Sequence, residues 1–136
     1  MIPKLTRATL ASMLALARDA RARAHAPYSG FKVGAALKTR AGEIVTGCNI
    51  ENASFGLTLC AERVAVFKAV SEGLSGFDAI AVVADSKRLT APCGPCRQIL
   101  WEFCGDIVVH MSNTKGRKRV MRLRDLLPLP FDGRSL

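Results

Sequence analysis

The sequence contains the stretches Cys60-Ala61-Glu62-Arg63 and Pro92-Cys93-Gly94-Pro95-Cys96, which together hold three cysteines and one glutamate. Three thiolates suit a tetrahedral Zn²⁺ ion and leave its fourth position open to water. Glu62 follows the first of these cysteines by two residues, so its carboxylate can face that water without binding the ion. We therefore predict one zinc ion per chain, held by Cys60, Cys93 and Cys96, with Glu62 moving protons in catalysis.

Both stretches open predicted helices. An apolar run follows Cys60 and ends at Gly73, and the run after the second stretch ends at Gly105, as glycine often marks a helix C-terminus. Pro95 fits this reading, because proline is favoured in the first turn of a helix. Helix N-termini favour negative charge, which offsets the net charge of about −1 on three thiolates and Zn²⁺. Arg63 can donate to the ligand sulfurs and adds to this compensation.

The rest of the pattern predicts the element order α-β-β-α-β-α-β-β-α. A first helix has Thr6 as its N-cap and Pro27 as its end. The run 78–84 is continuously apolar, as expected of a central strand covered on both faces. The other predicted strands are 31–39, 44–48, 107–111 and 120–123, and residues 125–127 form one helical turn. We expect a single α/β domain over residues 1–136, with three α/β/α layers and a mixed sheet of about five strands.

Packing is indicated by the sizes of side chains in this framework. The small residues Gly34-Ala35-Ala36 suggest that another backbone or a ligand approaches the first strand closely. The helix after Cys60 is apolar on nearly every face, which indicates burial against another subunit. The polar segment 49–56 leads into that helix. On local grounds it is either a border of the site or a helix-capping loop.

The overall composition narrows the class of protein. The chain has 136 residues, 49% of them hydrophobic, which is sufficient for a globular core. The cysteines number five, which is an odd count, and three of them have metal-type spacing, so a reducing, cytoplasmic compartment is expected. No run reaches the roughly 20 apolar residues of a membrane span. Residues 8–17 have the apolar character of a leader peptide, but Leu10, Met13, Leu14 and Ala17 recur at helical spacing and favour a core helix.

Further motifs accompany the two cysteine stretches in order along the chain. They are Pro27-Tyr28-Ser29, Phe31, Val33-Gly34-Ala35-Ala36-Leu37, the stretch Gly47-Cys48-Asn49-Ile50-Glu51-Asn52-Ala53-Ser54-Phe55-Gly56, and Arg97-Gln98. With them the chain strongly resembles the cytidine deaminases of the small homotetrameric type, over essentially its whole length. The cysteine stretches alone would indicate only a zinc deaminase, whereas the stretch from Asn49 to Phe55 adds nucleoside recognition.

The resemblance implies a role for each matching residue. Asn49 and Glu51 would hold the ribose hydroxyls, Phe31 would pack on the pyrimidine, and Phe131 would reach the site of a neighbouring subunit. Arg63 would bond to the zinc thiolates. Pro95 departs from the family, which more often has alanine there, and it removes one backbone N–H beside the ligands.

The activity implied by the resemblance is zinc-dependent hydrolytic deamination. Cytidine and 2′-deoxycytidine would become uridine and 2′-deoxyuridine with release of ammonia, as in pyrimidine salvage. The partners implied are a nucleoside substrate and three further copies of the chain, with sites at subunit interfaces in a homotetramer. No membrane is implied.

Other readings of the same residues remain. Cys48 or Cys104 could close a structural zinc site, and Cys93 with Cys96 could form a redox pair. Otherwise both extra cysteines are small buried hydrophobes, and His25 and His110 are structural. The net charge of +9 raises nucleic acid as a partner, through the basic residues Lys115, Arg117, Lys118, Arg119, Arg122 and Arg124. That run lacks aromatic residues for base stacking and reads better as a solvated strand edge. A cytosine-nucleoside antibiotic is a third possible substrate.

Overall fold

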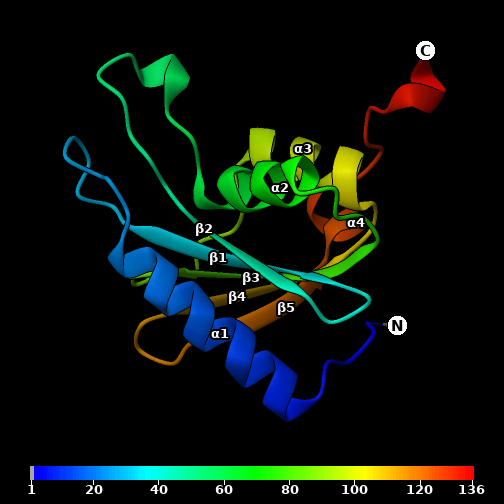
Figure 1. Ribbon diagram of the computed structural model, residues 1–136, viewed down its shortest axis with the longest axis horizontal. Helices are drawn as coiled ribbons and strands as arrows, with labels where there is room; N and C mark the ends of the chain where they lie inside the picture. Colours follow the sequence, from blue (N-terminus) through cyan, green and yellow to red (C-terminus); the bar gives the residue numbers. More distant parts are fainter. Residues whose placement is uncertain (1) are drawn as a thin grey trace.

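The computed structural model describes residues 2–136 and has a five-stranded sheet with helices on both faces (Figure 1). The predicted α/β class and the order of elements are confirmed. The elements are α1 (Arg7–Ala22), β1 (Val33–Thr39), β2 (Ile44–Cys48), η1 (Phe55–Leu57), α2 (Ala61–Ser71), β3 (Phe77–Ala84), α3 (Gly94–Cys104), β4 (Val108–Asn113), β5 (Lys118–Arg122), α4 (Leu123–Leu126) and η2 (Gly133–Ser135).

The sheet is mixed, with the strand order β2-β1-β3-β4-β5. β1 pairs antiparallel with β2 and β3, β3 pairs parallel with β4, and β4 pairs antiparallel with β5. The parallel pair requires a crossover, and α3 supplies it. β3 is the predicted central strand: it has a neighbour on each side, and all but one of its residues are buried.

Two apolar clusters cover the two faces of the sheet. On one face, Met13, Leu14 and Ala17 of α1 pack against alanines and Val83 of the sheet. The first helix is therefore a core element, as its periodicity predicts. On the other face, α2 and α3 supply Val66 and Leu100 to a larger cluster. The two cysteine-bearing helices thus lie together on one side, opposite α1 (Figure 1).

The ends of the first elements agree with the sequence prediction at the Thr6 cap and differ from it at two other points. The Thr6 side chain accepts from the backbone N–H of Thr9 at 3.1 Å, so the predicted cap is confirmed. The helix ends at Ala22 instead of continuing to Pro27. The first strand begins at Val33, and Phe31 lies outside it because the Asn49 amide donates to its carbonyl at 2.7 Å.

Two glycines allow a helix to touch each face of the sheet. A Cβ on Gly34 would lie 1.9 Å from the Ala17 carbonyl oxygen of α1. A Cβ on Gly47 would lie 2.5 Å from both the Ala61 carbonyl oxygen and the Ala65 nitrogen of α2. The close approach expected from small residues in this hairpin is therefore that of helix backbones.

No helix in the described part of the chain, residues 2–136, is both long and apolar enough to cross a membrane. Part of the apolar surface of α2, which the sequence predicts to be buried against another subunit, is exposed in the isolated chain. Phe67 and Val70 of α2 are 38% and 40% exposed in the isolated chain.

We predict that Gly47→Ala lowers the free energy of unfolding by about 1–3 kcal/mol, because the added methyl must push α2 away from β2. Gly133→Ala is the matched control, since a Cβ there meets no atom within 4 Å and the glycine has no positive φ. Chemical denaturation followed by circular dichroism measures both. Equal stability of the two variants would contradict the packing described.

Candidate metal centre and substrate cavity

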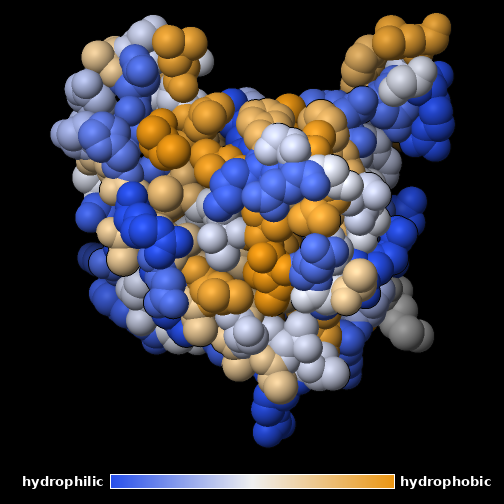
Figure 2. All heavy atoms as spheres, in the orientation of Figure 1, coloured by the Kyte–Doolittle hydropathy of each residue, from blue (hydrophilic) through white to orange (hydrophobic). Residues whose placement is uncertain are grey.

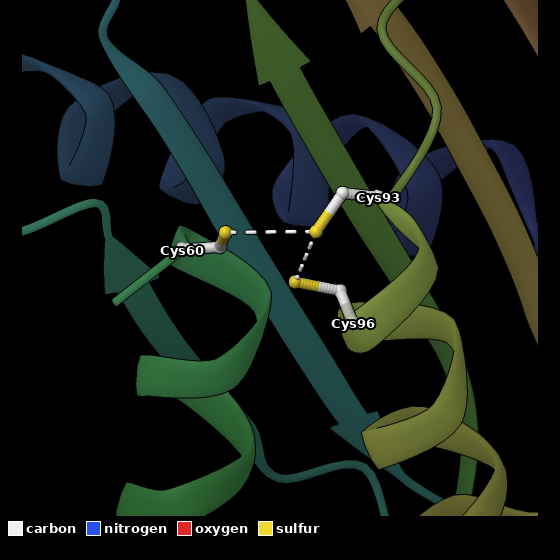
Figure 3. A group of neighbouring side chains, drawn as sticks. All are labelled: Cys60, Cys93 and Cys96. Atoms are coloured by element: carbon white, nitrogen blue, oxygen red, sulfur yellow. Dashed lines mark hydrogen bonds between the residues drawn. The ribbon is translucent and has the colours of Figure 1, made fainter. Parts of the chain in front are cut away.

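Three cysteine sulfurs converge between the N-termini of α2 and α3 (Figure 3). The Sγ atoms of Cys60 and Cys93 lie 3.7 Å apart, and those of Cys93 and Cys96 lie 3.3 Å apart. All three sulfurs lie within 4.8 Å of one another. A tetrahedral zinc with bonds of about 2.3 Å places its sulfurs roughly 3.8 Å apart, so the trio fits that ion closely.

Local sequence explains why these sulfurs meet. Cys60 is the N-cap of α2 and Cys93 is the N-cap of α3, while Cys96 lies in the first turn of α3. Neither N-cap side chain makes a capping hydrogen bond to the backbone of its helix, so both sulfurs can face the centre. Pro95 occupies the first turn, where its missing N–H costs little. The helix dipoles thus direct positive ends at three anionic ligands.

The donor set leaves one zinc position open. Within residues 2–136, no fourth His, Cys, Asp or Glu joins the group. Cys48 ends β2 and Cys104 ends α3, and neither belongs to the cluster. A closed structural zinc site built with either cysteine is therefore not supported, whereas a three-ligand catalytic site is.

The Cys60 sulfur is surrounded by groups that favour its negative charge. Its hydrogen bond with Cys96, aided by the Arg63 guanidinium, lowers the pKa of Cys60 to about 5. The same hydrogen bond with Cys60, together with burial, raises the pKa of Cys96. Arg63 Nη2 donates to Cys60 Sγ at 3.4 Å and to the Thr58 carbonyl at 3.2 Å. This contact is the one that the sequence analysis expected of Arg63.

Glu62 lies in the first turn of α2, immediately after the Cys60–Ala61 pair, and is only 5% exposed. Burial raises its pKa to about 7, and the charge of Cys60 acts in the same direction. A carboxyl with such a pKa can both accept and donate a proton near neutral pH. The structure places it on a cavity beside two of the ligands.

That cavity has a volume of about 230 Å³ and collects most of the predicted site residues. Phe31, Asn49, Glu51 and Glu62 line it, together with the first two cysteines of the cluster. Asn49 is 8% exposed, and its Oδ1 accepts from the Val33 N–H at 2.8 Å. Because its amide also donates to the Phe31 carbonyl, Asn49 holds the backbone of Phe31, which lines the cavity.

Glu51 is held by the turn at residues 28–29. Its Oε1 accepts from the backbone N–H groups of Tyr28 and Ser29 at 2.9 and 3.1 Å, and its Oε2 accepts from the Ser29 hydroxyl. The Ser29 hydroxyl is the largest of the causes that lower the pKa of Glu51. Glu51 is therefore an ionised acceptor at neutral pH, which suits the binding of sugar hydroxyls.

Sequence reasoning missed several residues that line the cavity or support it. Ser29 had a signal, since it belongs to the Pro27-Tyr28-Ser29 motif, but its bonds to Glu51 depend on the fold. Thr90 and Ala91 also line the cavity. They directly precede Pro92-Cys93 in the sequence, so position next to a ligand stretch was the available signal. Thr58 and Leu59 are the corresponding residues before Cys60.

Phe131 is the predicted residue that does not meet the others. It is 60% exposed and is not among the residues that line this cavity. Its carbonyl accepts from Gln98 Nε2 at 2.8 Å, and Trp101 Nε1 donates to the neighbouring Asp132 at 3.0 Å. These bonds tie the C-terminal segment to α3 of its own chain.

With this geometry described, comparison with known proteins identifies the family. Residues 8–111 match the model for the cytidine and deoxycytidylate deaminase zinc-binding region. The chain belongs to this family. It is 47% identical over 125 residues to a cytidine deaminase of Sporosarcina psychrophila, covering 91% of this chain and 92% of that one. A cytidine deaminase structure from Burkholderia pseudomallei superposes with a TM-score of 0.88 at 45% identity, covering 93% of this chain and 100% of that one.

A relative whose name gives a different activity has a lower sequence identity to this chain. A blasticidin-S deaminase of Bacillus cereus is 34% identical over 107 residues, covering 73% of this chain and 76% of that protein. The zinc-binding character of the family and the cysteine trio together bear out the predicted cofactor.

We predict that Cys96→Ser reduces bound zinc from about one ion per chain to a small fraction of that, because a serine hydroxyl is a poor replacement for a thiolate ligand. Cys104→Ser is the control, since Cys104 lies outside the cluster. Elemental analysis of the purified proteins gives the stoichiometry. Full zinc content in Cys96→Ser would show that the ion is held elsewhere.

Proposed function

We propose that the chain catalyses the hydrolytic deamination of cytidine and 2′-deoxycytidine to uridine and 2′-deoxyuridine, with release of ammonia. The observation that carries the proposal is the placement of buried Glu62 on the same cavity as Cys60, Cys93, Asn49 and Glu51. A cavity that joins a metal centre, a proton carrier and polar anchors has the parts that hydrolysis of a nucleoside amine requires. The similarity of the chain to proteins named cytidine deaminase supports the same reaction.

The residues Cys60, Cys93 and Cys96 would hold the Zn²⁺, whose chemistry is to act as a Lewis acid and acidify the attacking water. Glu62 takes the proton from that water and delivers it to N3 of the pyrimidine. As that proton moves, the water oxygen bonds to C4. Glu62 then takes the second proton from the new C4 hydroxyl and delivers it to the amine, which leaves as ammonia when the C4–N bond breaks. One carboxylate serves all transfers because its pKa near 7 makes both protonation states accessible.

Substrate orientation falls to the opposite wall of the cavity. The ionised Glu51 accepts hydrogen bonds from ribose hydroxyls, chiefly the 3′-OH, and Asn49 has a second amide hydrogen for the sugar. Phe31 is 40% exposed and supplies an apolar surface for the pyrimidine face. Burial of the reacting end beside Glu62 then sets C4 against the activated water.

The alternatives are less well supported by these contacts. A polynucleotide has an esterified 3′ oxygen, which cannot donate to Glu51. An antibiotic nucleoside would use the same centre, but the relative with that activity is less similar than the cytidine deaminases.

Assembly into a homotetramer, with sites completed at subunit interfaces, is part of the proposal. Phe67 and Phe103 lie 38% and 42% exposed, with ring centroids 6.3 Å apart, on the outer side of α2 and α3. Figure 2 shows hydrophobic patches on the face that carries α2. Phe131, which is remote from its own cavity, would serve a neighbouring one. A role in pyrimidine salvage in the cytoplasm agrees with five free cysteines, since thiolate ligands need reducing conditions.

We predict that Glu62→Gln lowers kcat for cytidine by about 10²–10⁴-fold while zinc content is unchanged, because the amide cannot take the proton. Loss of ultraviolet absorbance measures turnover of cytidine, deoxycytidine, dCMP and a short oligonucleotide side by side. The exposed Glu102→Gln on α3 is the control. Preference of the parent protein for the oligonucleotide, or substantial turnover by Glu62→Gln, would refute the proposal.

We predict that Glu51→Ala raises KM for cytidine by about tenfold to a hundredfold, because a hydrogen bond to a charged group contributes about 1.5–3 kcal/mol. The change in kcat should be smaller, since the sugar lies away from the reacting bond. Glu43→Ala, an exposed glutamate in the turn between β1 and β2, is the matched control. Steady-state kinetics measure both constants. An unchanged KM would show that Glu51 does not bind the sugar.

A further inference from the structure

A second, larger cavity lies on the α3 side of the sheet next to the edge strand β5. Its volume is about 510 Å³, within the range of small-molecule sites. We call it the basic groove. Four exposed cations line it: Arg88, Arg117, Lys118 and Arg119. No acidic residue is among the residues that line it.

The head groups of these four cations are available to a ligand. Within residues 2–136, no ion pair or side-chain hydrogen bond is formed by any of them, whereas Arg122 and Arg124 on the same segment pair with Asp106. Arg119 is directly opposite Met111 in the ladder between β4 and β5, so its side chain lies on the face of that core residue. Arg117 precedes β5 and also lines the groove, whereas strand alternation turns the Lys118 side chain toward the opposite face of the sheet.

The floor of the basic groove is apolar. Leu89, Met111, Met121 and Leu126 line it, and Met111 is 3% exposed. An apolar floor with a cationic rim suits a molecule that has one hydrophobic part and one anionic part. Arginine side chains bind phosphate oxygens through paired N–H groups, which makes phosphate the anion of choice.

Both walls of the basic groove are held by one buried residue. Asn113, 3% exposed, accepts from the backbone N–H of Arg117 at 2.8 Å and donates to the carbonyl of Ser86 at 3.2 Å. Ser86 in turn contacts Thr90 at 3.0 Å, oxygen to oxygen. The segment 85–92 and the turn 113–117 are therefore fixed relative to each other. The cations that line the groove are thus attached to backbone held by hydrogen bonds.

We propose that the basic groove binds a free nucleotide, with its phosphates on the arginines and its base over the apolar floor. The site is distinct from the catalytic cavity, because Ala91 is the one lining residue that the two cavities have in common. The size of the cavity suits a single nucleotide. No aromatic side chain lines it for stacking successive bases, so a single nucleotide fits better than a polynucleotide. The proposal does not rest on the deaminase activity.

Equilibrium binding to the intact protein tests this at about 150 mM salt, where weak surface attraction is screened. The probes are ATP, tripolyphosphate, adenosine and a short single-stranded oligonucleotide, and calorimetry gives affinity and stoichiometry. We expect ATP to bind with a Kd below about 1 mM, tripolyphosphate to bind more weakly, and adenosine to show no binding.

Two variants with the same loss of charge separate a site from general attraction. Arg117→Ala combined with Arg119→Ala should weaken ATP binding at least tenfold, because two charge-assisted contacts are lost. Arg7→Ala combined with Arg18→Ala removes two exposed arginines from α1 and should change affinity less than twofold. The groove variant should keep its circular dichroism spectrum and its turnover of cytidine, which shows that it is folded.

Three results would overturn the proposal. They are absence of ATP binding to the parent protein, an equal loss in both double variants, and tighter binding of the oligonucleotide than of ATP. The last result would assign the groove to a polynucleotide.

Discussion

The contact of α2 with β2 at Gly47 is the constraint on which the candidate site depends. The backbone of α2 can reach the sheet there only because residue 47 has no side chain. That approach sets the N-terminus of α2, and therefore Cys60 and Glu62, at the height of the loop that carries Asn49 and Glu51. Cys60 and the proposed sugar anchors come from segments that adjoin these two elements, so the contact at Gly47 helps to set their spacing.

Electrostatic compensation is the second requirement, because three thiolates and a carboxylate are gathered in a small volume. Burial near these anions would protonate Glu62 outright if nothing opposed it. The N-termini of α2 and α3 point at the sulfurs, and Arg63 bonds to the ligand nearest to Glu62 in the sequence. The result is a carboxyl poised near neutrality beside a ligand whose pKa is low. Both hydrogen bonds of Arg63, to Cys60 and to the Thr58 carbonyl, come from the single nitrogen Nη2.

How far the sequence could predict this arrangement depends on the range of each interaction. The cysteine trio and Glu62 were predictable, because each ligand stretch is local and helix N-termini follow from nearby glycine and proline. The central strand was predictable from its continuous apolar run. The start of β1 was not, because a side chain sixteen residues away in sequence satisfies the Val33 backbone. The bonds of Ser29 to Glu51 and the place of Thr90 in the cavity likewise depend on tertiary contacts. For Phe131, resemblance supplied a role that the isolated chain neither uses nor tests.

The basic residues between positions 115 and 124 show the same limit of prediction from sequence. They also lead to the segment that the two cavities share. In the sequence, the cations from Arg117 to Arg124 form one cluster. In the structure, Arg122 and Arg124 form ion pairs with Asp106. Arg117 and Arg119 instead line a groove together with Arg88. Tertiary structure therefore divides these charges between a structural ion pair and the proposed ligand groove. The segment from Arg88 to Ala91 has one side toward that groove and the other toward the catalytic cavity. Ala91 lines both cavities, so the two cavities share one residue of this segment. The hydrogen bonds of Asn113 and Ser86 hold this segment in place, and they therefore help to shape both cavities.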